Sequence, residues 1–191
     1  MPPHSDRIRC GCPGVPRGQK QLGQGLRPVA FLDRDGVVNA DKGYVHKIDE
    51  FEWMPGAMAA IRFLNDRRFI VAVVTNQSGI GRGYYGEEEF LKLSDWMLEE
   101  ADRQGAHIDA IYYCPHHPES DDPRYREMCP ARKPGTMMLE RAEEEFEIDK
   151  ARSFLIGNRD TDLYAADSFG ISGFMYESGD LAERIRVIVE G

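Results

Sequence analysis

Four apolar residues run directly into two carboxylates in the stretch Val29-Ala30-Phe31-Leu32-Asp33-Arg34-Asp35-Gly36. A short, uninterrupted apolar run that ends on charged residues is typical of a strand buried on both faces of a parallel sheet. Asp33 and Asp35 then follow the tip of that strand, where Gly36 permits a tight turn. Ligands of such sheets bind beyond the carboxyl ends of the strands. The stretch therefore predicts a core strand and two side chains of a site.

Apolar runs and helical patterns alternate along the rest of the chain. Further apolar runs, each expected to be a buried strand, cover residues 69–74, 108–114, 153–156 and 173–176. Apolar residues at helical spacing predict helices over residues 57–67, 87–104, 135–146 and 181–189. Because strands that alternate with helices form βαβ units, we expect an α/β fold with a doubly wound parallel sheet. A chain of 191 residues leaves room only for a minimal cap made of loops.

The first 27 residues differ in composition from the rest. They are rich in proline and glycine, and they carry five basic residues against one acidic residue. Such a segment buries too little apolar surface to offset the entropy of ordering it. We therefore expect residues 1–27 to be a flexible basic tail and residues 28–191 to form the folded domain.

Composition excludes several classes of protein. The net charge of −9 disfavours binding to nucleic acid, because the chain would repel phosphate backbones. There is no apolar run long enough to span a membrane, and the first residues lack the apolar centre of a secretory signal. Four cysteines are too few and too unevenly spaced for a disulfide scaffold. We expect a cytoplasmic protein that works as a monomer without a membrane partner.

Polar groups follow each of the other predicted strands. Thr75-Asn76-Gln77-Ser78 follows the second run, Cys114-Pro115-His116 the third, and Gly157-Asn158-Arg159 the fourth, while Arg132-Lys133 precedes a predicted helix. Any one of these motifs alone is most simply a solvated turn. Together they predict an active site, because a carboxylate can attack phosphorus while a hydroxyl and an ammonium hold its oxygens.

This combination resembles the haloacid dehalogenase (HAD) superfamily of phosphohydrolases. The resemblance rests on the motifs at Asp33, Thr75, Lys133 and Asn158, which occur in the order that the superfamily has. Longer matches narrow it to the heptose-1,7-bisphosphate 7-phosphatase subfamily, whose close relative is the histidinol-phosphatase domain. These matches are Asp41-Lys-Gly-Tyr-Val-His46, Phe51-Glu-Trp-Met-Pro-Gly56, Thr75-Asn-Gln-Ser-Gly-Ile-Gly-Arg-Gly83 and Tyr112-Tyr-Cys-Pro-His-His-Pro118.

The resemblance implies a role for each matching residue. Asp33 would be the nucleophile and Asp35 the general acid and base, with Thr75 and Lys133 stabilising the phosphoryl group. Magnesium would be held by Asp33, the backbone carbonyl of Asp35 and Asn158. The implied substrate contacts are Asp41, Lys42, Gly43, Tyr44, Asn76, Gln77, Ser78, Arg132 and Arg159.

The chain departs from the family pattern at two positions. Asn158 stands where the family has aspartate, so the magnesium site loses a negative charge that Asp160 or Asp162 would have to replace. The family also has a zinc loop with the ligands Cys-x-His and Cys-x-Cys. This chain has Cys114, His116 and Cys129, but Ala131 at the fourth position. Either the loop is metal-free, or His117, Cys10 or Cys12 supplies the missing ligand.

Three functions remain open on the sequence. The first is a Mg²⁺-dependent phosphohydrolase that removes the 7-phosphate of a heptose 1,7-bisphosphate through an aspartyl-phosphate intermediate. The second is a histidinol-phosphatase or another small phosphomonoesterase. The third, motivated by the departures at Asn158 and Ala131, is a weakened relative that binds a phosphorylated metabolite as a sensor.

Overall fold

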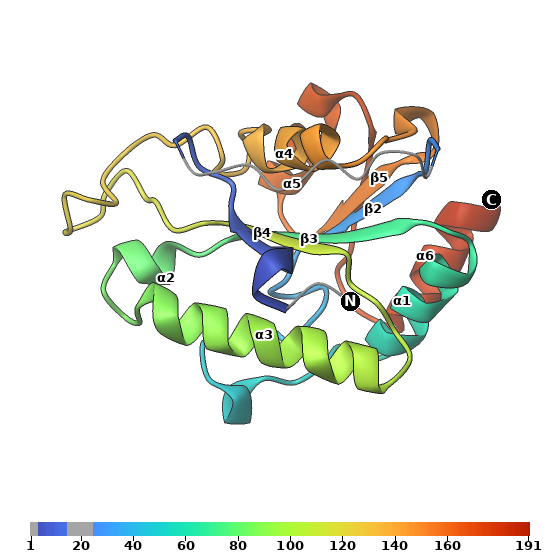
Figure 1. The fold of residues 1–191 in the computed structure, drawn as a ribbon, viewed down its shortest axis with the longest axis horizontal. Helices are drawn as coiled ribbons and strands as arrows, with labels where there is room; N and C mark the ends of the chain where they lie inside the picture. The colour runs from blue at the N-terminus through green and yellow to red at the C-terminus, as the bar shows by residue number, and fades with distance from the viewer. Residues whose placement is uncertain (1–3, 15–24) are drawn as a thin grey trace.

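The computed structural model describes residues 4–14 and 25–191, which form a six-stranded parallel sheet with helices on both faces (Figure 1). The strand order is β1-β4-β3-β2-β5-β6. The strands are β1 (Ile8–Cys10), β2 (Val29–Leu32), β3 (Ile70–Asn76), β4 (Ala110–Cys114), β5 (Phe154–Gly157) and β6 (Ser172–Met175). The α-helices are α1 (Ala57–Asp66), α2 (Ser78–Gly81), α3 (Glu87–Arg103), α4 (Met137–Glu145), α5 (Asp160–Phe169) and α6 (Leu181–Glu190). Three short 3-10 helices are η1 (His4–Arg7), η2 (Ile48–Glu50) and η3 (Lys150–Arg152).

The alternation of side chains along β2 divides the core into two layers. Val29 and Phe31 pack with the residues of α4 and α5, whereas Ala30 and Leu32 pack with those of α1, α3 and α6. All four residues are fully buried. Figure 1 shows the same division, with α4 and α5 over one face of the sheet and α1, α3 and α6 over the other. The expected doubly wound parallel sheet is confirmed.

The predicted elements agree with the structure to within two residues at each end, and the structure adds β1, α2, α5 and the three short 3-10 helices. The helix α5 and the edge strand β1 did not stand out in the apolar pattern, because β1 has only three residues and α5 has a weakly apolar face. One detail of the prediction is wrong. β6 is not buried on both faces, since as an edge strand it leaves Ser172 and Gly173 exposed.

The structure also corrects the expected flexible tail over its described part. Residues 8–10 pair in parallel with Ile111, Tyr112 and Tyr113 of β4 and extend the sheet at that edge. Arg7 anchors the strand, because its guanidinium donates to Asp102 at 2.6 Å and to the carbonyl of Ile108 at 2.8 Å. Residues 1–3 and 15–24 lie outside the described residues, so the division of the chain at residue 27 stays a prediction for them.

Two long connections lie beyond the carboxyl ends of the strands. Residues 33–56 join β2 to α1 with no element larger than η2, and residues 115–136 join β4 to α4 without a regular element. Within the part of the chain that the structure describes, these connections hold no element larger than η2, in agreement with the expected minimal cap made of loops. Among the described residues, none of the helices is both long and apolar enough to cross a bilayer.

Candidate active site

The carboxyl ends of three neighbouring strands meet at a cavity of about 450 Å³. β2 lies between β3 and β5, so Asp33, Thr75 and the residues after Gly157 meet at one edge of the sheet. Twelve of the predicted site residues line the cavity, namely Asp33, Asp35, Asp41, Gly43, Tyr44, Thr75, Asn76, Gln77, Ser78, Arg132, Lys133 and Arg159. The structure thus brings together side chains that are up to 126 residues apart in the chain.

A buried ammonium group sits between two carboxylates at the base of the cavity. Lys133 Nζ lies 2.8 Å from Asp33 Oδ1 and 2.6 Å from Asp162 Oδ1, and it donates to the carbonyl of Val74 at 2.8 Å. Asp33, Lys133 and Asp162 are all buried. Asp162 also accepts from the backbone N–H of Arg159, which fixes it at the start of α5. The ammonium of Lys133 is therefore held beside Asp33 by a second carboxylate.

Burial dominates the electrostatics of this group. It raises the pKa of Asp33 to about 6, with Lys133 opposing the shift and the charges of Asp162 and Asp35 adding to it. For Lys133, burial alone would lower the pKa, but the charges of Asp33 and Asp162 outweigh burial and raise it above its usual value. Because a neutral lysine would leave both carboxylates unpaired, the ammonium form is the one that this environment favours.

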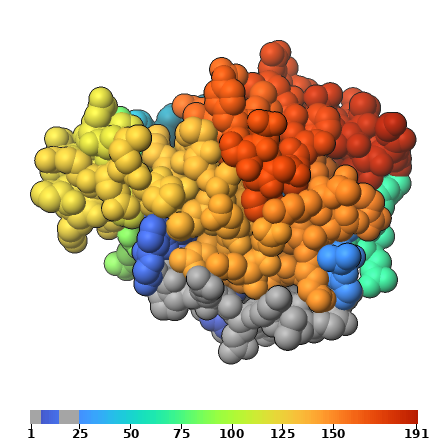
Figure 2. Space-filling view, turned by 90° about the horizontal axis from the view of Figure 1, so that it is seen from above, coloured from blue at the N-terminus to red at the C-terminus, as the bar shows by residue number. Residues whose placement is uncertain are grey.

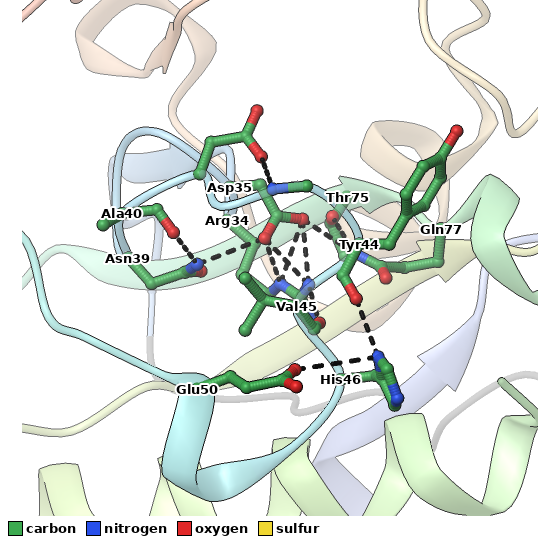
Figure 3. A network of polar contacts seen from close by, with 12 residues as sticks. Arg34, Asp35, Asn39, Ala40, Tyr44, Val45, His46, Glu50, Thr75 and Gln77 are labelled. Carbon is green, nitrogen blue, oxygen red and sulfur yellow. Dashed lines mark hydrogen bonds and ion pairs between the residues drawn. The ribbon is translucent and has the colours of Figure 1, made fainter. Parts of the chain in front are cut away.

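Asp35 is held by four donors (Figure 3). Arg34 donates Nη2 to its two oxygens at 2.8 and 2.9 Å, and Nε to both at 3.2 Å. Asn39 Nδ2 and Gln77 Nε2 donate to the same carboxylate at 3.2 and 3.1 Å. Arg34 is fully buried and bonds the carbonyl of Val45 at 2.7 Å. The Asp35 carboxyl group is therefore fixed at the mouth of the cavity.

The end of β3 and the residues that follow it connect the groups of the site to one another. Gln77 Nε2 donates to Thr75 Oγ1 at 2.7 Å, and Tyr85 donates to Gln77 Oε1 at 2.6 Å. The side-chain amide of Asn76 bonds both the N–H and the carbonyl of Lys133, at 3.0 and 3.1 Å. Thr75 is buried at the cavity wall, while Asn76 aligns the backbone that carries Lys133.

Basic side chains line the outer part of the cavity. Arg132 and Arg159 both line it, and Arg159 Nη2 lies 3.4 Å from Asp41 Oδ2. Burial lowers the pKa of Arg132, and the nearby charges of Arg82 and Arg159 lower it further. Arg132 and Arg159 therefore bring positive charge to the cavity wall of a chain that is acidic overall, which suits the binding of an anion.

Among the residues predicted for catalysis, substrate binding and magnesium, Lys42 and Asn158 do not line the cavity. Lys42 lies on the surface, where its Nζ pairs with Glu52 at 2.9 Å, so a substrate contact at Lys42 has no support in this arrangement. Asn158 follows β5 and packs against the turn at Gly36, where an added Cβ would lie 2.1 Å from Asn158 Nδ2. Gly36 also has a φ of 87°, which favours glycine. The turn therefore requires glycine both for its backbone conformation and for the space that Asn158 occupies.

The residues expected to hold magnesium fit that ion. Asn158 Oδ1 is buried and has no hydrogen-bond partner among the described residues, which leaves an amide oxygen free for a cation. Asp33 supplies a carboxylate at the end of the neighbouring strand β2. Asp162 does not replace the lost charge in this arrangement, because Lys133 and the Arg159 backbone engage its carboxylate. Asp160 is exposed in the first turn of α5.

A second cluster lies at the loop after β4. The side chains of Cys12, Cys114, His116 and Cys129 present ligand atoms that all lie within 4.8 Å of one another. Cys12 was one of three replacements left open for the missing zinc ligand, and it is the one found in this cluster. His117 instead faces Arg82 at 3.1 Å.

Several residues that build the site did not stand out in the sequence, where Asp162 was considered only as a replacement charge for magnesium. Arg34 and Asp162 position Asp35 and Lys133, and Pro134, Thr161 and Tyr85 also line the cavity. A basic residue between two aspartates, and an aspartate in the first turn of a helix after a strand, were the available signals. Neither pattern in the sequence indicates which side chain will pair with a buried charged group.

Comparisons with known proteins agree with this geometry. A family model described as HAD-hydrolase-like matches residues 130–185. A D-glycero-beta-D-manno-heptose-1,7-bisphosphate 7-phosphatase from Rhodopseudomonas palustris is 45% identical over 155 residues, which cover 81% of this chain and 86% of the relative. The solved structure of the D,D-heptose 1,7-bisphosphate phosphatase from B. bronchiseptica, complexed with magnesium and phosphate, is 30% identical with a TM-score of 0.71. That similarity covers 86% of this chain and 87% of the other.

Proposed function

Because this chain belongs to the HAD superfamily, in the family of D-glycero-beta-D-manno-heptose-1,7-bisphosphate 7-phosphatases, we propose that it removes the 7-phosphate from a heptose 1,7-bisphosphate. The chain is a phosphoric monoester hydrolase with the fold of that superfamily. The observation that carries the proposal is the contact of Lys133 with Asp33 at the base of a cavity whose outer part is lined by arginines. A nucleophile beside a fixed cation suits attack on a phosphoryl group.

The proposed reaction assigns one role to each group. An oxygen of Asp33 forms a bond to phosphorus as the bond from phosphorus to the sugar oxygen breaks. Asp35 gives its proton to that sugar oxygen. In the second half, Asp35 takes a proton from water, whose oxygen bonds phosphorus and releases inorganic phosphate from Asp33. Lys133 and Thr75 hold the phosphoryl oxygens during both steps.

Magnesium completes this proposal. Asp33, the backbone carbonyl of Asp35 and Asn158 would hold it, and its charge would offset that of the phosphoryl oxygens. The B. bronchiseptica structure is complexed with magnesium and phosphate. We extend the proposal to a structural zinc ion at Cys114, His116 and Cys129, which are the ligands present in the loop after β4.

Substrate recognition is proposed to lie at the mouth of the cavity. Arg132 and Arg159 line the cavity, and we assign to them the anionic and hydroxyl groups of the substrate beyond the reacting phosphate. Loops in place of a large cap leave room for an extended sugar that carries a second phosphate. We also propose that the enzyme works as a monomer, because residues of a single chain line the cavity. Its proposed location is the cytoplasm.

The test is phosphate release in the presence of Mg²⁺ from heptose 1,7-bisphosphate, histidinol phosphate and an aryl phosphate. Asp33→Asn is the loss-of-function variant, and Lys42→Gln is its control, because Lys42 lies outside the cavity. We expect turnover of the heptose substrate that falls by at least about 10³-fold in Asp33→Asn and by less than about twofold in the control.

The other outcomes separate the competing functions. Faster turnover of histidinol phosphate would replace the substrate but keep the enzyme class. Release from the aryl phosphate alone would leave a phosphatase with an unidentified substrate. Tight binding of one compound without release from any of them would favour the sensor and contradict the assigned roles of Asp33 and Asp35.

A further inference from the structure

The segment after β1 brings a fourth metal ligand to the end of β4 and the loop that follows it, which together supply only three. We infer that Cys12 completes a Cys₃His zinc site with Cys114, His116 and Cys129, and that this site fastens β1 to the loop after β4. The inference rests on the proposed zinc ion and adds to it the ligand that Ala131 cannot supply. It requires no particular substrate or activity.

The distances within the cluster match tetrahedral zinc. Zn–S bonds of about 2.3 Å place two sulfur ligands about 3.8 Å apart at the tetrahedral angle. Cys12 Sγ lies 3.8 Å from Cys114 Sγ and 3.2 Å from His116 Nδ1, and Cys114 Sγ lies 3.8 Å from the same nitrogen. Cys129 Sγ lies within 4.8 Å of the other three ligand atoms. The four atoms therefore already have the spacing of a closed coordination shell.

The surroundings of the cluster also suit a structural metal site. All four cysteines of the chain are free thiols, and the three in the cluster are buried. The second ring nitrogen of His116 faces a carboxylate, with Nε2 3.6 Å from Glu127 Oε1. Ligating histidines usually direct their other N–H to such a partner, which orients the ring. A set of three thiolates and one imidazole binds zinc in preference to magnesium.

The backbone of the N-terminal segment reaches the cluster because Gly11 has no side chain and Ala131 has only a methyl group. An added Cβ at Gly11 would lie 2.5 Å from Met138 Cγ and 3.4 Å from Ala131 Cβ, so the segment packs directly on the position of the missing ligand. The N–H of Gly11 donates to the carbonyl of Tyr113 at 2.8 Å. Arg141 donates to the carbonyl of Cys12 at 3.1 Å. Figure 2 shows this dark-blue segment beside the yellow and orange surface of the loop and α4.

The cluster is connected to the cavity through the backbone. The N–H of Arg132 donates to the carbonyl of Cys129 at 3.0 Å, and Arg132 Nη1 donates to the carbonyl of His116 at 3.3 Å. Lys133 follows directly. A metal ion at the four ligands would therefore fix the segment that carries Arg132 and Lys133, two of the cationic groups that line the cavity.

The experiment compares Cys12→Ser with Cys10→Ser in the full chain. The two cysteines lie two residues apart in the same segment, and Cys10 is not in the cluster. Zinc per chain is measured by elemental analysis after dialysis against a weak chelator. Co²⁺ is then titrated into metal-free protein, because the thiolate-to-cobalt absorption increases with the number of thiolate ligands.

We expect one zinc per chain in the wild type and in Cys10→Ser. In Cys12→Ser, zinc affinity should fall by more than about 100-fold, which exceeds the effect of removing an outer-shell partner. The thiolate-to-cobalt absorption should fall by about one third, because one of three thiolates is lost. Ala131→Cys added to Cys12→Ser should restore both readouts, which separates the loss of a ligand from a failure to fold.

Three results would overturn the inference. One is a wild-type protein that holds no zinc, and another is an unchanged cobalt spectrum and zinc content in Cys12→Ser. The third is equal loss in Cys10→Ser, which would make Cys10 a ligand or the effect non-specific. Because none of these readouts uses phosphate release, they are independent of the proposed substrate.

Discussion

At the scale of single residues, the site depends on buried charged side chains that are paired with one another and hydrogen-bonded to nearby backbone and amide groups. Lys133 serves two carboxylates, one from β2 and one from α5, while Arg34 holds Asp35 from a fully buried position. A buried charge that loses its partner costs far more than a surface charge that does so. The residues of the site are therefore residues of the fold as well.

Lys133→Met should lower both stability and activity. Removing the ammonium leaves Asp33 and Asp162 buried without a cation, so we expect the free energy of unfolding to fall by about 3–5 kcal/mol. Urea denaturation measures this. Lys42→Met is the control, because its exposed pair with Glu52 should contribute less than about 1 kcal/mol. Equal stability of the two variants would contradict the shared-cation arrangement.

Asn158→Asp should strengthen magnesium binding. A carboxylate in place of the neutral amide adds one negative charge beside Asp33, so we expect the Mg²⁺ concentration for half-maximal activity to fall about tenfold. Asp160→Asn is the matched control, since Asp160 is exposed in the first turn of α5. If Asp160→Asn weakens Mg²⁺ activation tenfold instead, then Asp160 and not Asn158 supplies the interaction.

At the scale of the elements, β1 decides how one edge of the sheet is closed. It has three residues, yet Ile8 is buried in the core and the salt bridges of Arg7 and Arg9 connect it to α3 and α4. Without β1, the polar backbone edge of β4 would be open to solvent and to other chains. A flexible tail would not have this effect.

Deletion of residues 1–10, which keeps Cys12, therefore tests whether β1 is a structural strand or part of a dispensable tail. We expect the free energy of unfolding to fall by about 2–4 kcal/mol, because the core loses Ile8 and β4 loses its pairing partner. Size-exclusion chromatography should show association through the exposed edge. Deletion of residues 1–3, which leaves β1 intact, is the control. A deletion protein as stable and monodisperse as the full chain would restore the interpretation of a dispensable tail.

At the scale of the whole molecule, the two proposed metal sites have different roles, one catalytic and one structural. The proposed magnesium site lies at the ends of β2 and β5, and the proposed zinc site joins the N-terminus to the loop after β4. Magnesium would take part in the reaction, whereas zinc would fix the position of the loop that covers the site, since the chain has no larger cap among its described residues. Their removal should therefore have separable consequences.

Removal of zinc should lower the unfolding temperature. A metal that binds only the folded chain stabilises it, so we expect a fall of at least about 5 °C in scanning calorimetry after treatment with a strong chelator. Excess Mg²⁺ should not reverse this change, but one equivalent of Zn²⁺ should. Cys12→Ser should respond to the chelator by a much smaller shift. An unfolding temperature that the chelator leaves unchanged would argue against a structural zinc ion.

The sequence alone determined the order of the elements and the place of the site. Apolar runs such as Val29–Leu32 and Ile70–Val74 can only be buried, and residues that interrupt them with charge, such as Asp33, must lie at their ends. Since both properties are local, they can be read without knowing the partners. The boundaries of the long helices were predictable for the same reason.

The tertiary structure alone decided which groups meet. Asp162 pairs with Lys133, Arg34 holds Asp35, and Cys12 joins Cys114 across 102 residues of sequence. Local composition suggested that residues 1–27 have too little apolar surface to order themselves, but β4 offered a free edge on which residues 8–10 could pair. Such contacts depend on long-range packing, because the partner of a buried polar group is set by the three-dimensional arrangement of the chain and not by its neighbours in sequence.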